Sequence, residues 1–339
     1  MTSISLTSTL ARAYQTRLAN NLLKTRIEAA SKEVTTGVKA DVAKHLRGDL
    51  SNVNQITARS AALKTYRLNA IDAQSRLSAI QSGLEALQTS ITSTGADILA
   101  QTATASKEAL LVRAGQGKGR AISVFNALNQ RVAGQSLFAG SNTSSPALRD
   151  PSIFLAQVDQ IAATHSSATD IRTALQTWLD APAGVGGFTD RFYLGNDAAA
   201  FQIPLDETEV ISSDLRATAP AFRDMLVGAA LQHVAFERRE TIDIETLRAL
   251  SLEAGRAFVS ADSALTQERG RVGFRQEAAE NAFLRIDAEK QMLDLALSKN
   301  ISVDPFESAQ ALENAQTQLE TLYQITARLN QLSLVDFLK

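Results

Sequence analysis

The chain has no cysteine among its 339 residues. This absence excludes disulfides, thiolate nucleophiles and cysteine-ligated metal sites. No segment reaches the run of roughly 18 apolar residues that a membrane-spanning helix needs, so we expect no membrane partner. The first ten residues lack a basic region followed by an apolar one, and we therefore expect no cleavable signal peptide.

Proline is scarce, and its distribution divides the chain. There are six prolines, and five of them fall between Pro146 and Pro220. Proline lacks an N–H and clashes with the preceding helical turn, so its absence from residues 1–145 leaves that arm free to form long helices. The last hundred residues contain only Pro305. The sequence therefore predicts two long helical arms around an irregular middle.

Aromatic residues make up only 5% of the chain, which favours thin helical layers over an aromatic-filled globule. The net charge of −2 gives no reason to expect nucleic acid as a partner. The charge is unevenly distributed, however. Residues 1–71 hold 11 basic and 4 acidic residues, whereas residues 240–339 hold 10 and 16. The arms should attract each other, within one chain or between stacked chains, unless these charges only solvate helix faces.

Apolar residues recur every seven positions in both arms, from Ile56 to Ile98 and again from Phe258 to Leu293. A stripe this narrow can be buried only by a neighbouring helix, as in a bundle or coiled coil. We therefore expect the two stripes to form the core of a rod. The candidate core residues are Ile56, Leu63, Leu77, Leu84, Ile91, Phe258, Leu265, Val272, Ile286 and Leu293.

The predicted fold is mainly α. A long antiparallel helical coiled-coil or bundle rod, built from both arms, carries a small α+β central domain. The predicted parts are terminal helices at 1–45 and 301–339, a long-helix rod at 46–145 and 241–300, and a variable outward-facing domain at 146–240.

The central domain is expected to have only a modest core of its own. Its pattern predicts one helix over 153–179 and another over 222–236. Short strands are expected at 192–194, 200–203 and 209–212, where β-formers stand beside turn residues.

No constellation of residues indicates catalysis. The three histidines, His45, His165 and His233, lie far apart in the sequence. The stretch Gly115-Gln-Gly-Lys-Gly-Arg120 superficially resembles a phosphate loop, but no strand precedes it and the Lys-Ser/Thr pair is missing. We expect no catalytic, cofactor-binding or metal-binding residues, and no enzyme.

Three segments resemble motifs of the flagellin superfamily. Residues 30–39 (ASKEVTTGVK) are similar to its "xLsTGk" element, and residues 329–338 (LNQLSLVDFL) to its "SLlDfL" ending. Residues 129–143 (NQRVAGQSLFAGSNT) resemble the "N…G.yLFaGs.t" segment typical of hook–filament junction proteins and less typical of filament flagellins. The motif residues there are Leu137, Phe138, Ala139, Gly140 and Ser141.

The resemblance departs from the family pattern at two places. Val34-Thr-Thr stands where Leu-Ser-Thr is usual, and Gly134-Gln-Ser replaces Gly-x-Tyr. It covers about 1–145 and 255–339 well and is weak in 146–240.

The resemblance implies a structural adaptor of the bacterial flagellum. It would join the hook, through another hook-associated protein, to the flagellin filament, and would be exported by the flagellar type III system to an extracellular position. The implied partners are copies of the chain in a ring, a neighbouring hook-associated protein, flagellin, and an export chaperone that binds 305–339. The implied inner-tube contacts are Leu10, Leu18, Leu22, Leu312, Leu319, Leu322 and Leu329.

Two alternatives stay open. A filament-forming flagellin would have the same helical arms and apolar stripes and would differ only in its role. A cytoplasmic signalling coiled coil, such as a chemoreceptor stem, would also carry long seven-residue repeats. The missing membrane span and the proline- and glycine-containing middle argue against that second alternative.

Overall fold

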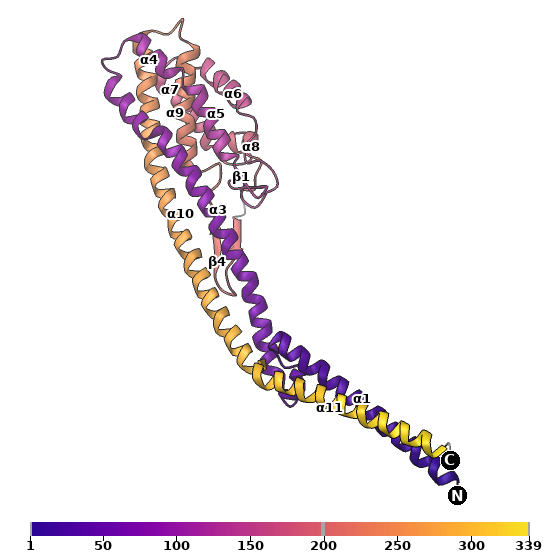
Figure 1. The fold of residues 1–339 in the computed structure, drawn as a ribbon. Coiled ribbons are helices and arrows are strands. Elements are labelled where there is room, and N and C mark those ends of the chain that lie inside the picture. Colours follow the sequence, from indigo (N-terminus) through magenta and orange to yellow (C-terminus); the bar gives the residue numbers. More distant parts are fainter. Residues whose placement is uncertain (1, 198–200, 338–339) are drawn as a thin grey trace. The chain divides into compact units, whose positions relative to one another are not determined.

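A computed structural model describes residues 2–197 and 201–337, with side chains described for residue 11, 13–197 and 202–328. It is 74% helical, and its described part has two small antiparallel sheets, which confirms the predicted mainly α fold (Figure 1). The chain forms two compact units, residues 1–64 with 287–339 and residues 65–286. Each unit is described by itself, and the predicted three-part division stays a prediction.

The first unit is built on two terminal helices, α1 (Thr2–Thr36) and α11 (Pro305–Phe337). It also holds the short helix α2 (Val42–His45), the beginning of α3 (Ser51–Gln101) and the end of α10 (Ile244–Ile301). α1 and α11 pack along their lengths as an antiparallel pair.

Local signals in the sequence end α1 and start α11. Gly37 follows α1 with a φ of 69°, the left-handed conformation that glycine adopts freely at a helix C-terminus. Asp304 precedes α11, and its Oδ1 accepts a hydrogen bond of 2.8 Å from the backbone N–H of Phe306. Pro305 takes the first helical position, where no N–H is needed. An antiparallel bridge between Val38 and Ser302 holds the two ends together.

In the second unit, α3 and α10 run antiparallel. Ser78 pairs with Gln276, Gln88 with Thr266 and Thr92 with Asp262 through side-chain hydrogen bonds of 2.8 to 3.4 Å. Each step forward along α3 is matched by the same step back along α10, which fixes the register of the pair.

The seven-residue stripes of α3 and α10 face inward. Nine of the ten candidate core residues are at most 8% exposed, and Leu293 is half-buried. Ile56, Leu63 and Leu293 belong to the first unit and the other seven to the second. The remaining heptad residues of α3, Ala70 and Ile98, are buried as well.

Six shorter helices complete the second unit: α4 (Lys107–Ala114), α5 (Gly117–Leu128), α6 (Pro151–Ala163), α7 (Ala168–Asp180), α8 (Phe188–Phe192) and α9 (Pro220–Glu237). α9 packs against α4, α5, α6 and α7 and is buried along most of its length.

Residues 153–179 are largely helical, as predicted, but they form two helices because the chain breaks between α6 and α7. Ser167 caps α7, and its hydroxyl accepts a hydrogen bond from the N–H of Asp170 at 3.1 Å. The strand predicted at 192–194 is wrong. Phe192 ends α8, and Tyr193 makes only an isolated bridge to Leu148.

An aromatic cluster fills the space between these helices, and Phe125 of α5 joins it to residues of the predicted central domain. It consists of Phe125, Phe154, Trp178, Phe188 and Phe192, with ring centroids 5.2 to 6.4 Å apart. Edge-to-face and tilted pairs of this kind add to the free energy gained by burying the rings. Five of the chain's aromatic residues, including its only tryptophan, therefore pack together in this unit.

Two small hairpins make up the sheets. β1 (Arg131–Val132) pairs with β2 (Gln135–Ser136), and β3 (Phe201–Pro204) pairs with β4 (Val210–Ser213), with Ile203 opposite Ile211. β3 and β4 each end one residue later than the sequence predicted.

The β3–β4 hairpin is fastened to both long helices. Asn69 of α3 donates to the carbonyl of Pro204 at 2.8 Å, and Arg275 of α10 donates to Asp214 at 2.7 Å. In the turn, the Asp206 carboxylate accepts from the N–H groups of Thr208 and Glu209, and these donors hold its pKa below the ordinary value.

We predict that Phe154→Ala will destabilise the second unit by about 3–5 kcal/mol, because a fully buried ring leaves a cavity. The only tryptophan, Trp178, has its ring centroid 5.9 Å from that of Phe154, so its fluorescence during urea unfolding measures the loss. Phe274→Ala is the control, because Phe274 is 74% exposed and its loss should change stability by less than about 0.5 kcal/mol. Equal effects of the two changes would contradict this account.

Candidate assembly surface

One face of α1 packs against α11. Leu23 and Ala30 of α1 are buried, and Ile27 between them is half-buried. On α11 the covered positions follow each other at alternating steps of four and three, which is the spacing of a coiled-coil seam. They are Ser308, Leu312, Ala315, Leu319, Leu322 and Thr326.

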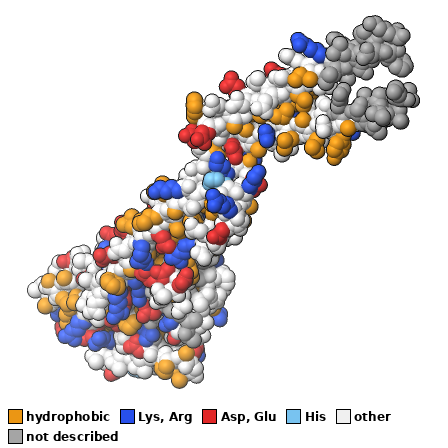
Figure 2. Space-filling model, turned by 90° about the horizontal axis from the view of Figure 1, so that it is seen from below, with side chains coloured by type: hydrophobic (Ala, Val, Ile, Leu, Met, Phe, Trp, Pro, Cys, Tyr) orange, Lys and Arg blue, Asp and Glu red, His pale blue; other side chains and the backbone are white. Residues whose placement is uncertain are grey.

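α1 carries a second apolar face that no part of the described chain covers. Tyr14, Leu18 and Leu22 follow each other at steps of four and are 70%, 60% and 54% exposed. Leu18 lies five residues before the seam residue Leu23, about 140° around the helix at 3.6 residues per turn. Figure 2 shows hydrophobic side chains at the surface of the described part of this arm, next to the grey ends.

The structure separates the predicted inner-tube residues into groups. Leu312, Leu319 and Leu322 line the seam within the chain, whereas Leu18 and Leu22 point away from it. The side chains of Leu10 and Leu329 lie outside the described residues. The role of all seven in assembly stays a prediction.

Other exposed apolar residues of the first unit were not selected from the sequence. Met292 and Leu295 near the end of α10 are 68% and 59% exposed, and Phe306 at the start of α11 is 75% exposed. The sequence does contain a sign of the outer face of α1. One apolar stripe ends at Leu22 and another begins at the next residue, Leu23, so the two stripes lie on different sides of the helix. Of the exposed apolar residues in the first unit, Tyr14, Leu18 and Leu22 share one side of a helix, which is the arrangement of an apolar patch for another protein.

The motif residues 137–141 pack inside the second unit. Phe138 and Ala139 are fully buried, and the Phe138 ring meets Phe222 edge-to-face at 5.7 Å. The carbonyl of Phe138 accepts from the N–H of Ala217, and that of Ala139 accepts from Asn196. This motif therefore anchors a distant chain segment.

The glycine-rich stretch 115–119 serves helix packing. A Cβ on Gly117 would lie 2.5 Å from the backbone nitrogen of His233 and 2.7 Å from the carbonyl oxygen of Ala229. The glycine thus lets α5 approach the backbone of α9. Arg120, which could have served a phosphate, donates to Gln232 at 2.6 Å.

We predict opposite effects for two alanine substitutions in α5. Gly117→Ala should destabilise the second unit by about 1–3 kcal/mol, since the added methyl overlaps backbone atoms that cannot move away easily. Gly119→Ala should stabilise it by about 0.5–1 kcal/mol, because its Cβ would point into open space and alanine favours the helix. Urea unfolding followed by tryptophan fluorescence measures both, and a stabilising Gly117→Ala would refute the packing role.

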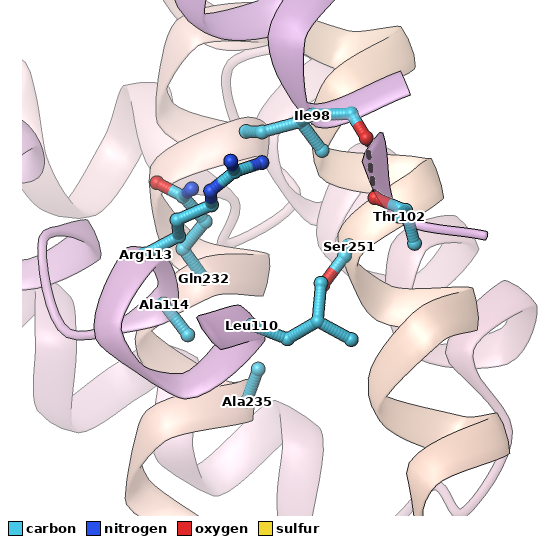
Figure 3. Close-up of a pocket in the computed structure, with 8 residues that line it drawn as sticks. All are labelled: Ile98, Thr102, Leu110, Arg113, Ala114, Gln232, Ala235 and Ser251. Atoms are coloured by element: carbon cyan, nitrogen blue, oxygen red, sulfur yellow. Dashed lines mark hydrogen bonds between the residues drawn. The ribbon is translucent and has the colours of Figure 1, made fainter. Parts of the chain in front are cut away.

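Two cavities among the described residues are either very small or lined by paired charges. Figure 3 shows a small one between the end of α3 and helices α4, α9 and α10, with a volume of about 10 Å³. That is room for about one water molecule. The hydroxyl of Ser251, one of its lining groups, already donates to the carbonyl of Leu247 at 2.8 Å.

A wider open cleft of about 280 Å³ is lined by charged side chains, and each of its arginines has a carboxylate partner. Arg216 pairs with Asp197 at 3.8 Å and Arg271 with Glu268 at 2.8 Å. Arg223 pairs with Asp180 at 3.0 Å. Charges compensated in this way leave little attraction for a charged ligand.

Two further searches were confined to the part of the chain that the structure describes. Its acidic and histidine side chains form no group of three or more able to hold a metal ion. Its helices include none that is long and apolar enough to cross a membrane.

We predict that two neighbouring leucines of α1 respond differently to glutamine. Leu23→Gln buries a polar group in the seam with α11 and should lower the stability of the first unit by about 2–4 kcal/mol. Leu22→Gln, on the exposed face, should change it by less than about 0.5 kcal/mol. Limited proteolysis of α1 in the dilute protein compares them, and equal protection of the two variants would contradict the assignment of the seam.

Comparison with known proteins agrees with this architecture. Residues 258–338, most of α10 together with α11, match the bacterial flagellin C-terminal helical region. The fold is similar to that of a "putative flagellar hook-associated protein from Vibrio parahaemolyticus", with a TM-score of 0.54 and 14% sequence identity over 74% of this chain and 96% of that chain. No curated protein sequence matches the chain.

These matches point to a non-enzymatic structural protein, as the sequence predicted. The sequence match to bacterial flagellin covers residues 258–338, and the fold is similar to that of a flagellar hook-associated protein.

Proposed function

We propose that this chain is a hook-associated adaptor that joins the hook, through a neighbouring hook-associated protein, to the flagellin filament. The observation that carries the proposal is the second apolar face of α1. α11 of the same chain fills one side of α1, while Tyr14, Leu18 and Leu22 remain exposed on the other. A closed ring of copies at the end of the hook would cover such a face on every subunit.

The adaptor role is favoured over a filament flagellin by two observations. Residues 129–143 resemble the segment typical of junction proteins, and the solved structure with a similar fold is described as hook-associated. The flagellin match at 258–338 argues against the signalling coiled coil.

Export by the flagellar type III apparatus and an extracellular position at the hook–filament junction belong to the same proposal. Before assembly, the apolar groups of α11 would need protection, which an export chaperone bound to 305–339 would supply. Phe306, Tyr323 and Ile325 are 75%, 49% and 51% exposed and would be its contacts.

We predict that a strain lacking this chain makes hooks without filaments and releases flagellin into the medium, because flagellin has no surface on which to polymerise. Electron microscopy and assay of the medium measure both, and antibody against the chain should label only the end of the hook. Long filaments built from this protein itself would overturn the adaptor role.

Complementation refines the test. A gene carrying Leu18→Gln and Leu22→Gln should restore filaments poorly, because it removes the outer apolar face without touching the seam. A gene carrying Lys118→Gln, which changes an exposed polar residue of the second unit, should restore them fully.

A further inference from the structure

The two terminal helices carry opposite charge. α1 has five basic and two acidic residues, and α11 has one basic and four acidic residues. Within the described part of the chain, Arg17 and Lys24 of α1 are exposed and make no ion pair, and the same holds for Glu313 and Glu320 of α11. These four residues therefore do not contribute to the attraction between the arms that their opposite charges predict within one chain.

The four unused charges have matching spacing. Arg17 and Lys24 are seven residues apart, and so are Glu313 and Glu320. Seven residues make two helical turns, so each pair lies along one side of its helix with about 10 Å between its members.

These charges lie outside the seam within the chain. Lys24 follows the seam residue Leu23 and is turned from it by about 100°. Glu313 and Glu320 each follow a seam residue, Leu312 and Leu319, in the same way. Both pairs are therefore exposed, one on each helix of the α1–α11 pair, and are open to contact with another molecule.

The two pairs also lie at the same level along the first unit. Val38 is opposite Ser302, so counting back along α1 and forward along α11 places Lys24 level with Gln316 and Arg17 level with Tyr323. Glu313 and Glu320 are each three residues from those levels, an offset of about 4.5 Å. Two copies standing side by side can thus match both charges with only a small shift.

We propose that Arg17 and Lys24 of one copy pair with Glu320 and Glu313 of the next copy. Tyr14 and Leu18, which lie about 60° and 100° around α1 from Arg17, would then be covered by the outer side of the neighbouring α11. We choose a second copy of the chain as the partner because each chain carries both pairs. Each copy can therefore present its basic pair to one neighbour and its acidic pair to the other. Such a head-to-tail contact forms a ring where the rotation between neighbouring copies closes. The inference rests on the proposed function, since it specifies the lateral contact of that ring.

Other charges nearby do not oppose the contact. Glu28 lies four residues from both Lys24 and Lys32, and the Glu-before-Lys order favours its interaction with Lys32 over that with Lys24. Arg328 lies eight residues beyond Glu320, past the level of Arg17.

The absence of cysteine allows a clean test of this contact. Asn21 lies between Arg17 and Lys24, Thr317 lies between Glu313 and Glu320, and both are exposed. Full-length Asn21→Cys and Thr317→Cys chains, mixed and oxidised mildly over a range of concentrations, should form a disulfide heterodimer. Neither variant alone should form comparable homodimers. A mixture of Asn21→Cys with Lys118→Cys, an exposed site of the second unit, gives the background.

A charge swap tests the ion pairs themselves. Arg17→Glu with Lys24→Glu on the Asn21→Cys chain should lower the heterodimer yield about tenfold, because two attractive pairs become repulsive. Glu313→Lys with Glu320→Lys on the Thr317→Cys chain should do the same, and mixing the two reversed chains should restore the yield. Arg26→Glu is the matched control: it makes the same charge change two residues from Lys24, about 200° around α1, and should leave the yield unchanged.

Several results would overturn the inference. They are a heterodimer no more abundant than background, predominant Asn21→Cys homodimers, or reversed chains that fail to recover while their helical circular dichroism is normal. A cross-link in isolated flagella only to a protein of another mass would assign the surface to that protein instead. Cross-linking does not depend on the deletion phenotype, so the two tests can fail separately. If mixing the reversed chains restores the cross-link but the deletion strain still makes filaments, only the proposed function is refuted.

Discussion

A narrow apolar stripe on a long helix can be buried only by another helix running alongside it, and this constraint organises the whole chain. α3 and α10 contain 51 and 58 residues, and each presents an apolar residue at nearly every seventh position. Neither stripe is wide enough to form a core alone. Within the second unit their antiparallel register places these stripes face to face. The shorter helices then pack around α9, which the α5 backbone approaches closely at Gly117.

The same constraint has a different outcome in α1 and α11. There the chain supplies one partner helix, but α1 carries apolar side chains on two nearly opposite faces. Leu23 is 8% exposed, whereas the preceding residue, Leu22, is 54% exposed. In our proposal the missing partner is another copy, so the first unit reaches its full burial only in an assembly. The charges of the two helices would then decide which neighbours meet, while the apolar groups supply most of the free energy.

The periodic parts of the fold could be predicted from the sequence, because their signals are local. Gly37, Asp304 and Pro305 mark helix ends through their own backbone chemistry, and the hairpin at 201–213 was placed within one residue. The break between α6 and α7 was missed, although Ser167 could have been recognised as a cap. The aromatic cluster was missed because a low average content says nothing about where in space those residues meet. The need for glycine at position 117 depends on a helix more than a hundred residues away.

The candidate surface could be predicted only in part, for a related reason. The stepping of Tyr14, Leu18 and Leu22 is visible in the sequence, but which stripe the chain covers with its own α11 is decided by tertiary packing. The residues with the strongest family resemblance, 137–141, prove to be internal anchors, with Phe138 and Ala139 fully buried. A motif can thus identify a family through packing alone, without marking where its members touch. If contacts between subunits lie on helix faces such as the outer side of α1, related chains can keep the same fold while changing exposed charges such as Lys24 and Glu313. Their position in the flagellum would then depend on which neighbours those charges select.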